Sequence, residues 1–336
     1  MASKIGILDM IPRDYASSVR EGFNNSTRLA QVADKVGLQR YWVSEHHSTP
    51  AVISNSPFIS VTHLAANTEN IKIGTGAVIM NNLSPFQISE NFRVLHALYP
   101  NRIEAGIGHT LESEVNFQVD SGLDMAHKMD YREELLDTYR FMNGRFDGED
   151  PRRKLHALPL DFSQAPPLTI MVSSLNNVKF IAENGWGLVY GLFITGDRKE
   201  CEEVIRVYHE NFVPNEHRRK PEATVAVYGV SAYDRKDIKP LNIALNEWIK
   251  IFPSDKRNML QLMSLSQAYD EAELVGKDWE DPYRDYKVSG TPRQVQAEMR
   301  RMQKSLKCDD FLMINQLSGF KQRRDFIEIL GDVSLY

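Results

Sequence analysis

Short apolar runs alternate with longer amphipathic segments along the whole chain. The short runs are rich in β-branched and aromatic residues, a composition that favours β-strands. The longer segments carry apolar residues at positions i, i+3, i+4 and i+7, a spacing typical of helices with one buried face. We expect eight strands, at residues 4–10, 40–44, 71–80, 102–107, 168–173, 188–194, 224–232 and 310–315.

The helical segments carry recognisable start and stop signals. Ser26 is expected to cap a helix with an apolar stripe from Leu29 to Val36, which Gly37 ends. Elsewhere a capping side chain stands directly ahead of an apolar stripe, in three cases with proline at the first helical position. These capping positions are Ser56, Ser84, Asp197 and Thr291.

Strands that are separated by helices pair in parallel through right-handed crossovers, and eight of them close naturally into a barrel. We therefore predict an α/β fold, a (β/α)8 TIM barrel that forms a single domain over residues 1–336. Residues 145–167 and 235–287 do not fit the repeat. The second stretch is a candidate lid over the carboxyl ends of the strands, although an insertion that packs on the rim without gating is an equal alternative.

Composition narrows the function. The chain has a formal net charge of −5 with both signs interspersed, so no positive surface is available for nucleic acid and a small-molecule partner is expected. Cys201 and Cys308 lie far apart in sequence and are expected to be reduced. No stretch approaches the roughly 18 apolar residues of a membrane span, and no secretory signal is visible. We therefore expect a cytoplasmic protein that does not bind membranes.

The second predicted strand leads into an acidic and imidazole-bearing sequence, Glu45-His46-His47. In a parallel barrel, reactive groups lie at the carboxyl ends of strands. Neighbouring residues of a strand point to opposite faces, so Glu45 and His47 are not expected to share a side with His46. A metal centre built from all three is therefore not predicted, and no other cluster of ligands has suitable spacing.

Two further strand ends carry signals for a ligand. Residues 71–80 are rich in small residues, so a flat ring system lying against Gly76 and Ala77 is one explanation, and a bulge that tightens barrel closure is the other. The fifth strand ends in Ser173 and Ser174 directly before a helix, where hydroxyls and free N–H groups suit a phosphate. These serines are also ordinary capping residues. Gly106 and Gly108 lack the context of a dinucleotide fingerprint.

Together these motifs resemble the bacterial luciferase-like, flavin-dependent monooxygenase family. The resemblance covers nearly the whole chain and rests on the order and spacing of its motifs. They lie at residues 5–9, 42–47, 74–78, 84–90, 101–108, 172–174 and 289–292.

The resemblance implies a barrel that binds reduced FMN or, in one branch, the deazaflavin F420. By position, Gly76 and Ala77 match a non-proline cis peptide beneath the flavin ring. Glu45 matches a carboxylate near the flavin, His46 matches a histidine of the oxygen chemistry, and His47 completes the expected catalytic group. The remaining cofactor contacts match Met171, Ser173 and Ser174, with His109 at the place of a frequent arginine.

A histidine at position 109 puts the affinity for the FMN phosphate in question, because an imidazole is a weaker phosphate partner than a guanidinium group. Lys128 or Arg132, at the start of the next predicted helix, are candidates to compensate.

The function implied by the resemblance is a monooxygenase that uses reduced FMN and O2 to oxidise a small organic substrate, with a separate flavin reductase as partner. Two alternatives remain: an F420- or NAD(P)H-dependent oxidoreductase, and a non-catalytic flavin-binding barrel.

Members of the family often form homodimers through the helices after the second and third strands. The apolar residues expected to supply this face, or else to pack against the barrel, are Phe58, Val61, Leu64, Ala65, Ile88, Phe92 and Leu95.

Overall fold

The computed structural model of the chain describes residues 4–109, 130–146, 148–159, 165–255, 259–276 and 278–334. Within these residues, eight parallel strands close into a barrel in the order β10-β1-β2-β3-β5-β6-β7-β8, and β8 pairs with β10. The short β4 pairs with β5, and β9 pairs with β8 near its end. The strands are β1 (Lys4–Asp9), β2 (Arg40–Val43), β3 (Lys72–Thr75), β4 (Val78–Ile79), β5 (Ile103–Gly108), β6 (Leu168–Val172), β7 (Gly187–Gly191), β8 (Ala223–Ser231), β9 (Lys287–Gly290) and β10 (Asp310–Ile314).

The predicted barrel and its eight strands are thus confirmed, with two differences in detail. The predicted strand at 71–80 is interrupted, because β3 ends at Thr75 and β4 begins at Val78. The predicted strand at 188–194 ends early, because Gly191 is followed directly by the short helix α7.

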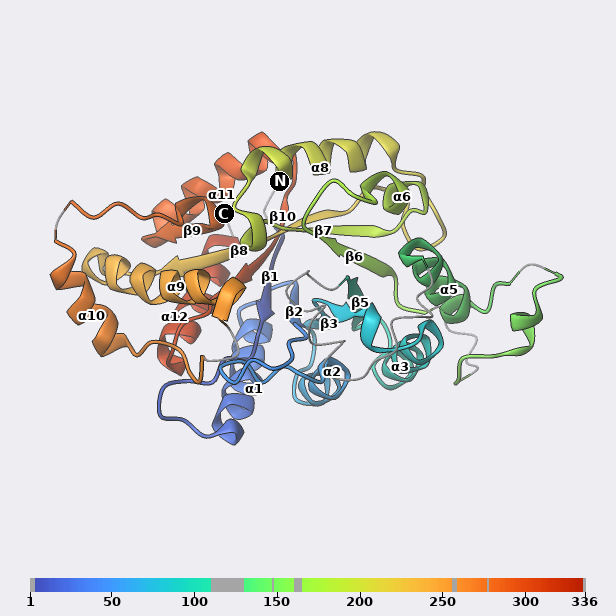
Figure 1. The fold of residues 1–336 in the computed structure, drawn as a ribbon, viewed down its shortest axis with the longest axis horizontal. Coiled ribbons are helices and arrows are strands. Elements are labelled where there is room, and N and C mark those ends of the chain that lie inside the picture. The colour runs from blue at the N-terminus through green and yellow to red at the C-terminus, as the bar shows by residue number, and fades with distance from the viewer. Residues whose placement is uncertain are drawn as a thin grey trace.

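Helices lie around the outside of the barrel, and α9 and α10 pack against each other at one side of it (Figure 1). The helices are α1 (Val19–Lys35), α2 (Pro57–Ala66), α3 (Pro85–Leu98), α5 (Tyr131–Asn143), α6 (Val178–Glu183), α7 (Leu192–Thr195), α8 (Arg198–Asn211), α9 (Arg235–Asp255), α10 (Leu265–Leu274), α11 (Pro292–Leu306) and α12 (Phe320–Ser334). Three short 3-10 turns are η1 (Met80–Asn82), η2 (Pro151–Lys154) and η3 (Arg284–Tyr286).

The capping signals predict most helix starts correctly. Ser84 and Thr291 form capping boxes, and the Asp197 carboxylate accepts two backbone N–H groups of α8. The prediction for Ser26 is wrong: α1 begins earlier, behind Ser18, whose capping box with the residue three positions on satisfies the free N–H groups. Ser26 lies inside α1, is buried, and donates to Asp9 Oδ2 at 2.6 Å.

The indole of Trp42, which is 2% exposed, packs inside the barrel with apolar side chains of other strands, among them Leu8 and Leu312. Three glycines make room for this ring. A Cβ atom at Gly74 would lie 2.7 Å from Trp42 Nε1, and one at Gly76 would lie 2.8 Å from Trp42 Cε3. One at Gly106 would lie 1.9 Å from the Thr75 carbonyl oxygen. On the side where a Cβ atom would point, these glycines therefore face the indole of Trp42, while Gly76 also lines the cavity above it.

An ionic cluster surrounds the base of this indole. Trp42 Nε1 donates to Glu104 Oε2 at 2.6 Å, and Arg40 Nε lies 3.0 Å from the same oxygen. Arg40 Nη1 also contacts Asp310 at 2.9 Å. Burial alone lowers the pKa of Arg40, but the carboxylates of Glu104 and Asp310 more than offset this and raise it. The guanidinium group is therefore the charge that permits two carboxylates inside the barrel.

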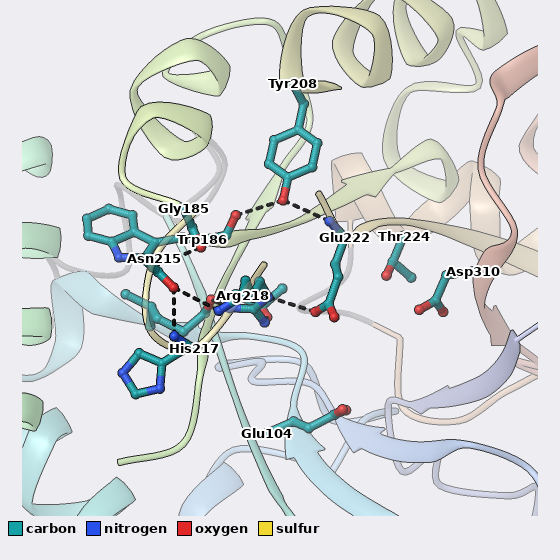
Figure 2. A network of polar contacts seen from close by, with 12 residues as sticks. Glu104, Gly185, Trp186, Tyr208, Asn215, His217, Arg218, Glu222, Thr224 and Asp310 are labelled. Atoms are coloured by element: carbon teal, nitrogen blue, oxygen red, sulfur yellow. Dashed lines mark hydrogen bonds and ion pairs between the residues drawn. The ribbon is translucent and has the colours of Figure 1, made fainter. Parts of the chain in front are cut away.

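A second polar network lies beside this cluster (Figure 2). Arg218 donates to Glu222 Oε2 at 2.7 Å and to the Leu168 carbonyl oxygen at 2.6 Å. The hydroxyl of Tyr208 donates to the Trp186 carbonyl oxygen at 2.9 Å and accepts from the backbone N–H of Glu222 at 3.1 Å. These bonds tie the segment ahead of β8 to β6 and to the segment ahead of β7, so the amino-terminal end of the barrel is held together by polar contacts.

Replacing the buried cation tests this account of the barrel interior. We expect Arg40→Met to lower the free energy of unfolding by about 3–5 kcal/mol, because Glu104 and Asp310 are then buried without a counter-charge. Lys72→Met is the matched control, since Lys72 Nζ is 3.5 Å from Glu104 but the side chain is half exposed. The control should cost less than about 1 kcal/mol. Urea denaturation measures both, and equal costs would contradict the proposed role of Arg40.

Candidate active site

A cavity of about 350 Å³ lies at the carboxyl ends of the barrel strands, where ligand sites of such barrels are found. Its lining includes seven of the residues predicted from the sequence, contributed by the ends of β2, β3, β5 and β6. They are Glu45, His46, Gly76, Ala77, His109, Met171 and Ser173. Two predicted residues, His47 and Ser174, lie outside the lining.

Glu45 is buried, and hydrogen bonds hold its carboxylate from several sides. Oε2 accepts from the backbone N–H of Ile79 at 2.8 Å, and Oε1 accepts from Asn82 Nδ2 at 2.8 Å. His47 Nε2 lies 2.8 Å from the same Oε1. The carboxylate therefore fixes the end of β2 to the segment that follows β3, which places the predicted histidines relative to Gly76 and Ala77.

His46 lies where the chain leaves β2 and turns along the cavity. Its backbone N–H donates to the Ser54 carbonyl oxygen at 3.2 Å, and the hydroxyls of Ser44 and Ser54 lie 3.1 Å apart. These contacts fix the backbone of residues 44–46 relative to Ser54. His46 lines the cavity, and so does Glu45, whereas His47 does not and bonds to Glu45. The expectation that residues 45 and 46 lie on opposite faces does not hold here, because β2 ends at Val43 and the chain then leaves strand geometry.

The wall beside His46 is formed by small residues. The peptide bond between Gly76 and Ala77 is cis, as the resemblance implied. Gly108, at the end of β5, lies opposite: a Cβ atom there would approach the Ala77 Cβ to 3.1 Å. The small residues thus leave the cavity a flat surface, with Met171 of β6 next to it.

A cationic side chain lies beside the predicted phosphate segment. Arg132, near the start of α5, donates through Nε to Asn177 Oδ1 at 2.8 Å, and its guanidinium group lies over the Phe180 ring at 5.3 Å. Asn177 directly precedes α6, and Ser174 Oγ accepts from the backbone N–H of Asn176 at 3.4 Å. The neighbouring His109 ring packs edge-on against Tyr131, with centroids 4.8 Å apart. The other candidate cation, Lys128, lies outside the described residues.

The opposite wall of the cavity was missed by the sequence analysis. It is aromatic, with Tyr228 from β8, Phe193 from α7, and Tyr283 and Tyr286 from the insertion, and it carries Lys250 of α9. Only Tyr228 had a usable signal, because the alternation along residues 223–231 places it on the inner face of a strand. The others lie in segments without a strand pattern, so nothing in the sequence brought them together.

A buried ion pair lies inside the insertion, where its last residue, Lys287, begins β9 and pairs with β8 of the barrel. Lys287, at the start of β9, lies 2.8 Å from Asp281 Oδ2 and donates to Asn246 Oδ1 of α9. Asn246 in turn donates to Asp281 Oδ1 at 3.0 Å. Trp248 Nε1 donates to the hydroxyl of Tyr228 at 2.9 Å, which ties α9 to β8. The position of α9 over the cavity is therefore set by hydrogen bonds to two strands.

The described part of the chain brings no three His, Cys, Asp or Glu side chains together as a metal site. Among the same residues, no helix combines the length and the apolar content needed to cross a membrane.

Lys287 gives the stability of the protein a specific pH dependence. Burial lowers its pKa from 10.5 to about 8, despite the opposing effect of Asp281. Between these values the folded chain binds fewer protons than the unfolded chain, so the free energy of unfolding rises with pH. Relative to Lys287→Met, we expect the wild type to gain up to about 1.4 kcal/mol per pH unit between pH 8 and 10.5.

Chemical denaturation at several pH values measures this slope. Lys220→Met, which removes an exposed lysine, is the control and should show no such slope relative to the wild type. A stability difference between wild type and Lys287→Met that does not change with pH would contradict the assignment.

The profile of a family described as luciferase-like monooxygenase matches residues 3–306. The chain is 25% identical to a luciferase-like monooxygenase of Escherichia coli, over 97% of this chain and 96% of that one. It is 23% identical to N-acetyl-S-alkylcysteine monooxygenase of Bacillus subtilis, over 99% and 98%. It is also 22% identical to the oxygenase component of a flavin-dependent trigonelline monooxygenase of Acinetobacter baylyi, over 67% and 63%.

Solved structures share the fold. Apo-MsnO8 superposes with a TM-score of 0.86 at 23% identity, covering 99% of this chain and 98% of that one. The oxygenating constituent of 3,6-diketocamphane monooxygenase from Pseudomonas putida, in complex with FMN, gives 0.73 at 17% identity, over 98% and 97%. The F420-dependent tetrahydromethanopterin reductase of Methanopyrus kandleri gives 0.69 at 14% identity, over 98% of each chain.

Proposed function

Because the chain belongs to the luciferase-like monooxygenase family, we propose that it uses reduced FMN and O2 to oxidise a small organic substrate. The observation that carries this proposal is the cavity itself, which is lined at four strand ends by five of the six predicted cofactor residues and by His46. When bound, reduced FMN supplies the electrons and activates O2. The protein supplies binding, orientation and protection from water.

The cavity residues fit the two unlike parts of FMN. The small residues Gly76, Ala77 and Gly108 offer a flat apolar surface for the ring system. For the phosphate we propose Ser173 and Ser174, with Arg132 as the cation that replaces the usual arginine at position 109. Arg132 donates a hydrogen bond to Asn177, which lies three residues after Ser174, and this supports the placement. Guanidinium groups are strong partners of phosphate oxygens.

His46 is our candidate for the group that holds or moves a proton beside the substrate. It lines the cavity, and an imidazole can both donate and accept a proton. Glu45 and His47 act differently in this proposal. Because their side chains bond to each other and to Asn82, they position the segment that carries His46.

Residues 235–287 are proposed to shield the reaction from water as part of a single-domain protein. Ile249 and Lys250 of α9 and the two tyrosines near η3 border the cavity. Exclusion of water protects reactive oxygen species from side reactions.

A separate reductase is the proposed source of reduced FMN, since one relative is named as an oxygenase component. A homodimer is also proposed, but not through the apolar residues named from the sequence. Val61 and Phe92 are fully buried against the barrel, and Phe58 packs on the same core. The outward faces of α2 and α3 instead expose Ile59 and Leu98, at 72% and 57%.

The alternative on the same barrel is an F420- or NAD(P)H-dependent reductase, which the fold of the F420-dependent neighbour keeps open. Stopped-flow mixing of protein-bound reduced FMN with O2 separates the two. A monooxygenase should show a transient absorbance that belongs to neither reduced nor oxidised FMN, and a reductase should not. A protein that binds neither added FMN nor F420 would contradict both activities.

The phosphate assignment is tested by comparing FMN with riboflavin, which lacks the phosphate. Arg132→Met should weaken FMN binding about 10- to 100-fold, the range for a hydrogen bond to a charged group, and leave riboflavin binding unchanged. Lys179→Met is the matched control, because this exposed lysine of α6 pairs with Glu183 at 3.6 Å. Fluorescence titration measures the affinities of the wild type and both variants for FMN and for riboflavin. Equal losses for FMN and riboflavin would show that Arg132 acts through the fold and not through the phosphate.

The role of His46 predicts a loss of turnover without a loss of flavin binding. His46→Ala should slow oxygen-dependent substrate oxidation by about 10²–10⁴-fold, as removal of a general acid or base does. The dissociation constant of FMN should stay within about twofold. His63→Ala, on the exposed side of α2, is the control. Unchanged turnover in His46→Ala would remove this residue from the chemistry.

A further inference from the structure

The cavity has two unlike halves that come from different parts of the chain. The half proposed for the cofactor is built by the ends of β2, β3, β5 and β6. The other half is built by β8, α7, α9 and the segment around η3, and no cofactor residue was predicted there. If the proposed function holds, this second half is the surface that remains for the substrate.

The second half is a wall of aromatic rings. Phe193 and Tyr228 pack edge to face with centroids 5.6 Å apart, and Tyr283 and Tyr286 do so at 5.7 Å. A Cβ atom at Gly196 would lie 2.4 Å from the Tyr286 ring, so this ring is packed closely on the backbone. Fixed rings of this kind offer apolar contact area at a small cost in side-chain entropy.

One cation borders this wall. Lys250 is the one Lys or Arg side chain among the cavity-lining residues that the structure describes. Its Nζ is 3.9 Å from Glu247 Oε2, a distance too long for a strong hydrogen bond, and its side chain is 67% exposed. Tyr228 and the Asn246 network anchor α9, so the backbone of Lys250 is fixed relative to the aromatic wall.

We propose that the substrate is a small carboxylate with an apolar or aromatic body, that the body packs on the aromatic wall, and that Lys250 binds the carboxylate. A single ammonium group matches a single negative charge, whereas a phosphate is usually held by several donors. The cofactor's phosphate has its own proposed partner in Arg132, on α5. This assignment of the substrate class depends on the proposed function, which has its own test in flavin binding.

The test uses benzoate and its neutral counterpart benzamide as probes, titrated into the FMN-loaded protein and followed by calorimetry. Benzoate should bind more tightly than benzamide. Lys250→Met should weaken benzoate about fivefold, the modest effect of a largely exposed charge, with benzamide unchanged. Lys250→Arg should retain most of the preference. Lys236→Met is the matched control, since Lys236 is an exposed lysine of the same helix that pairs with Asp234.

A second variant gives an effect of opposite sign. Glu247→Gln removes the carboxylate that competes for Lys250 and should strengthen benzoate binding about twofold, again with benzamide unchanged. Simple damage to the fold would weaken both probes. Equal affinities for the two probes, no binding of either, or a Lys250→Met protein that binds benzoate as the wild type does would each overturn the proposal. An FMN affinity measured in parallel keeps this result separate from a failure of flavin binding.

Discussion

The structure depends on how the interior of the barrel is filled below the cavity. The Trp42 indole occupies this space because Gly74, Gly76 and Gly106 carry no side chain that would collide with it. Its N–H group bonds to Glu104, whose charge is balanced by Arg40. The Trp42 ring and the buried ion pair thus occupy the barrel interior below the cavity, and the cavity lies at the carboxyl ends of the strands. The packing of the barrel interior therefore limits where a ligand can lie, whichever polar residues surround the cavity.

Above this layer, the site is organised by hydrogen bonds between neighbouring strand ends. Glu45 accepts from Ile79, Asn82 and His47 and so joins the end of β2 to the segment after β3. A carboxylate that is satisfied in this way is well suited to hold neighbouring groups in place. His46, between Glu45 and His47, is consequently held at the cavity wall.

The sequence predicted what depends on local pattern. All eight strands follow from runs of apolar residues, and most helix starts follow from caps, but Ser26 was misassigned because the box at Ser18 supplies a better N-terminus. Gly76 and Ala77 were interpreted as room for a flat ring. The indole beside Gly74 and Gly76 is that of Trp42, which belongs to the adjacent strand, and no sequence pattern links it to these glycines. The aromatic wall was missed because Tyr228 and Tyr286 are brought together only by the folded insertion.

The two halves of the cavity are built by different parts of the chain. The half proposed for the cofactor and the half proposed for the substrate are therefore held in place by different contacts. The half proposed for the flavin is made by regular strand ends, whose positions are fixed by the hydrogen-bond register of the barrel. The other half is largely made by residues 235–287, which are held by side-chain contacts such as that between Lys287 and Asp281. Changes in such contacts can alter the aromatic wall without shifting the strand register. The half proposed for the cofactor is therefore constrained by the fold, and the half proposed for the substrate is constrained mainly by the insertion.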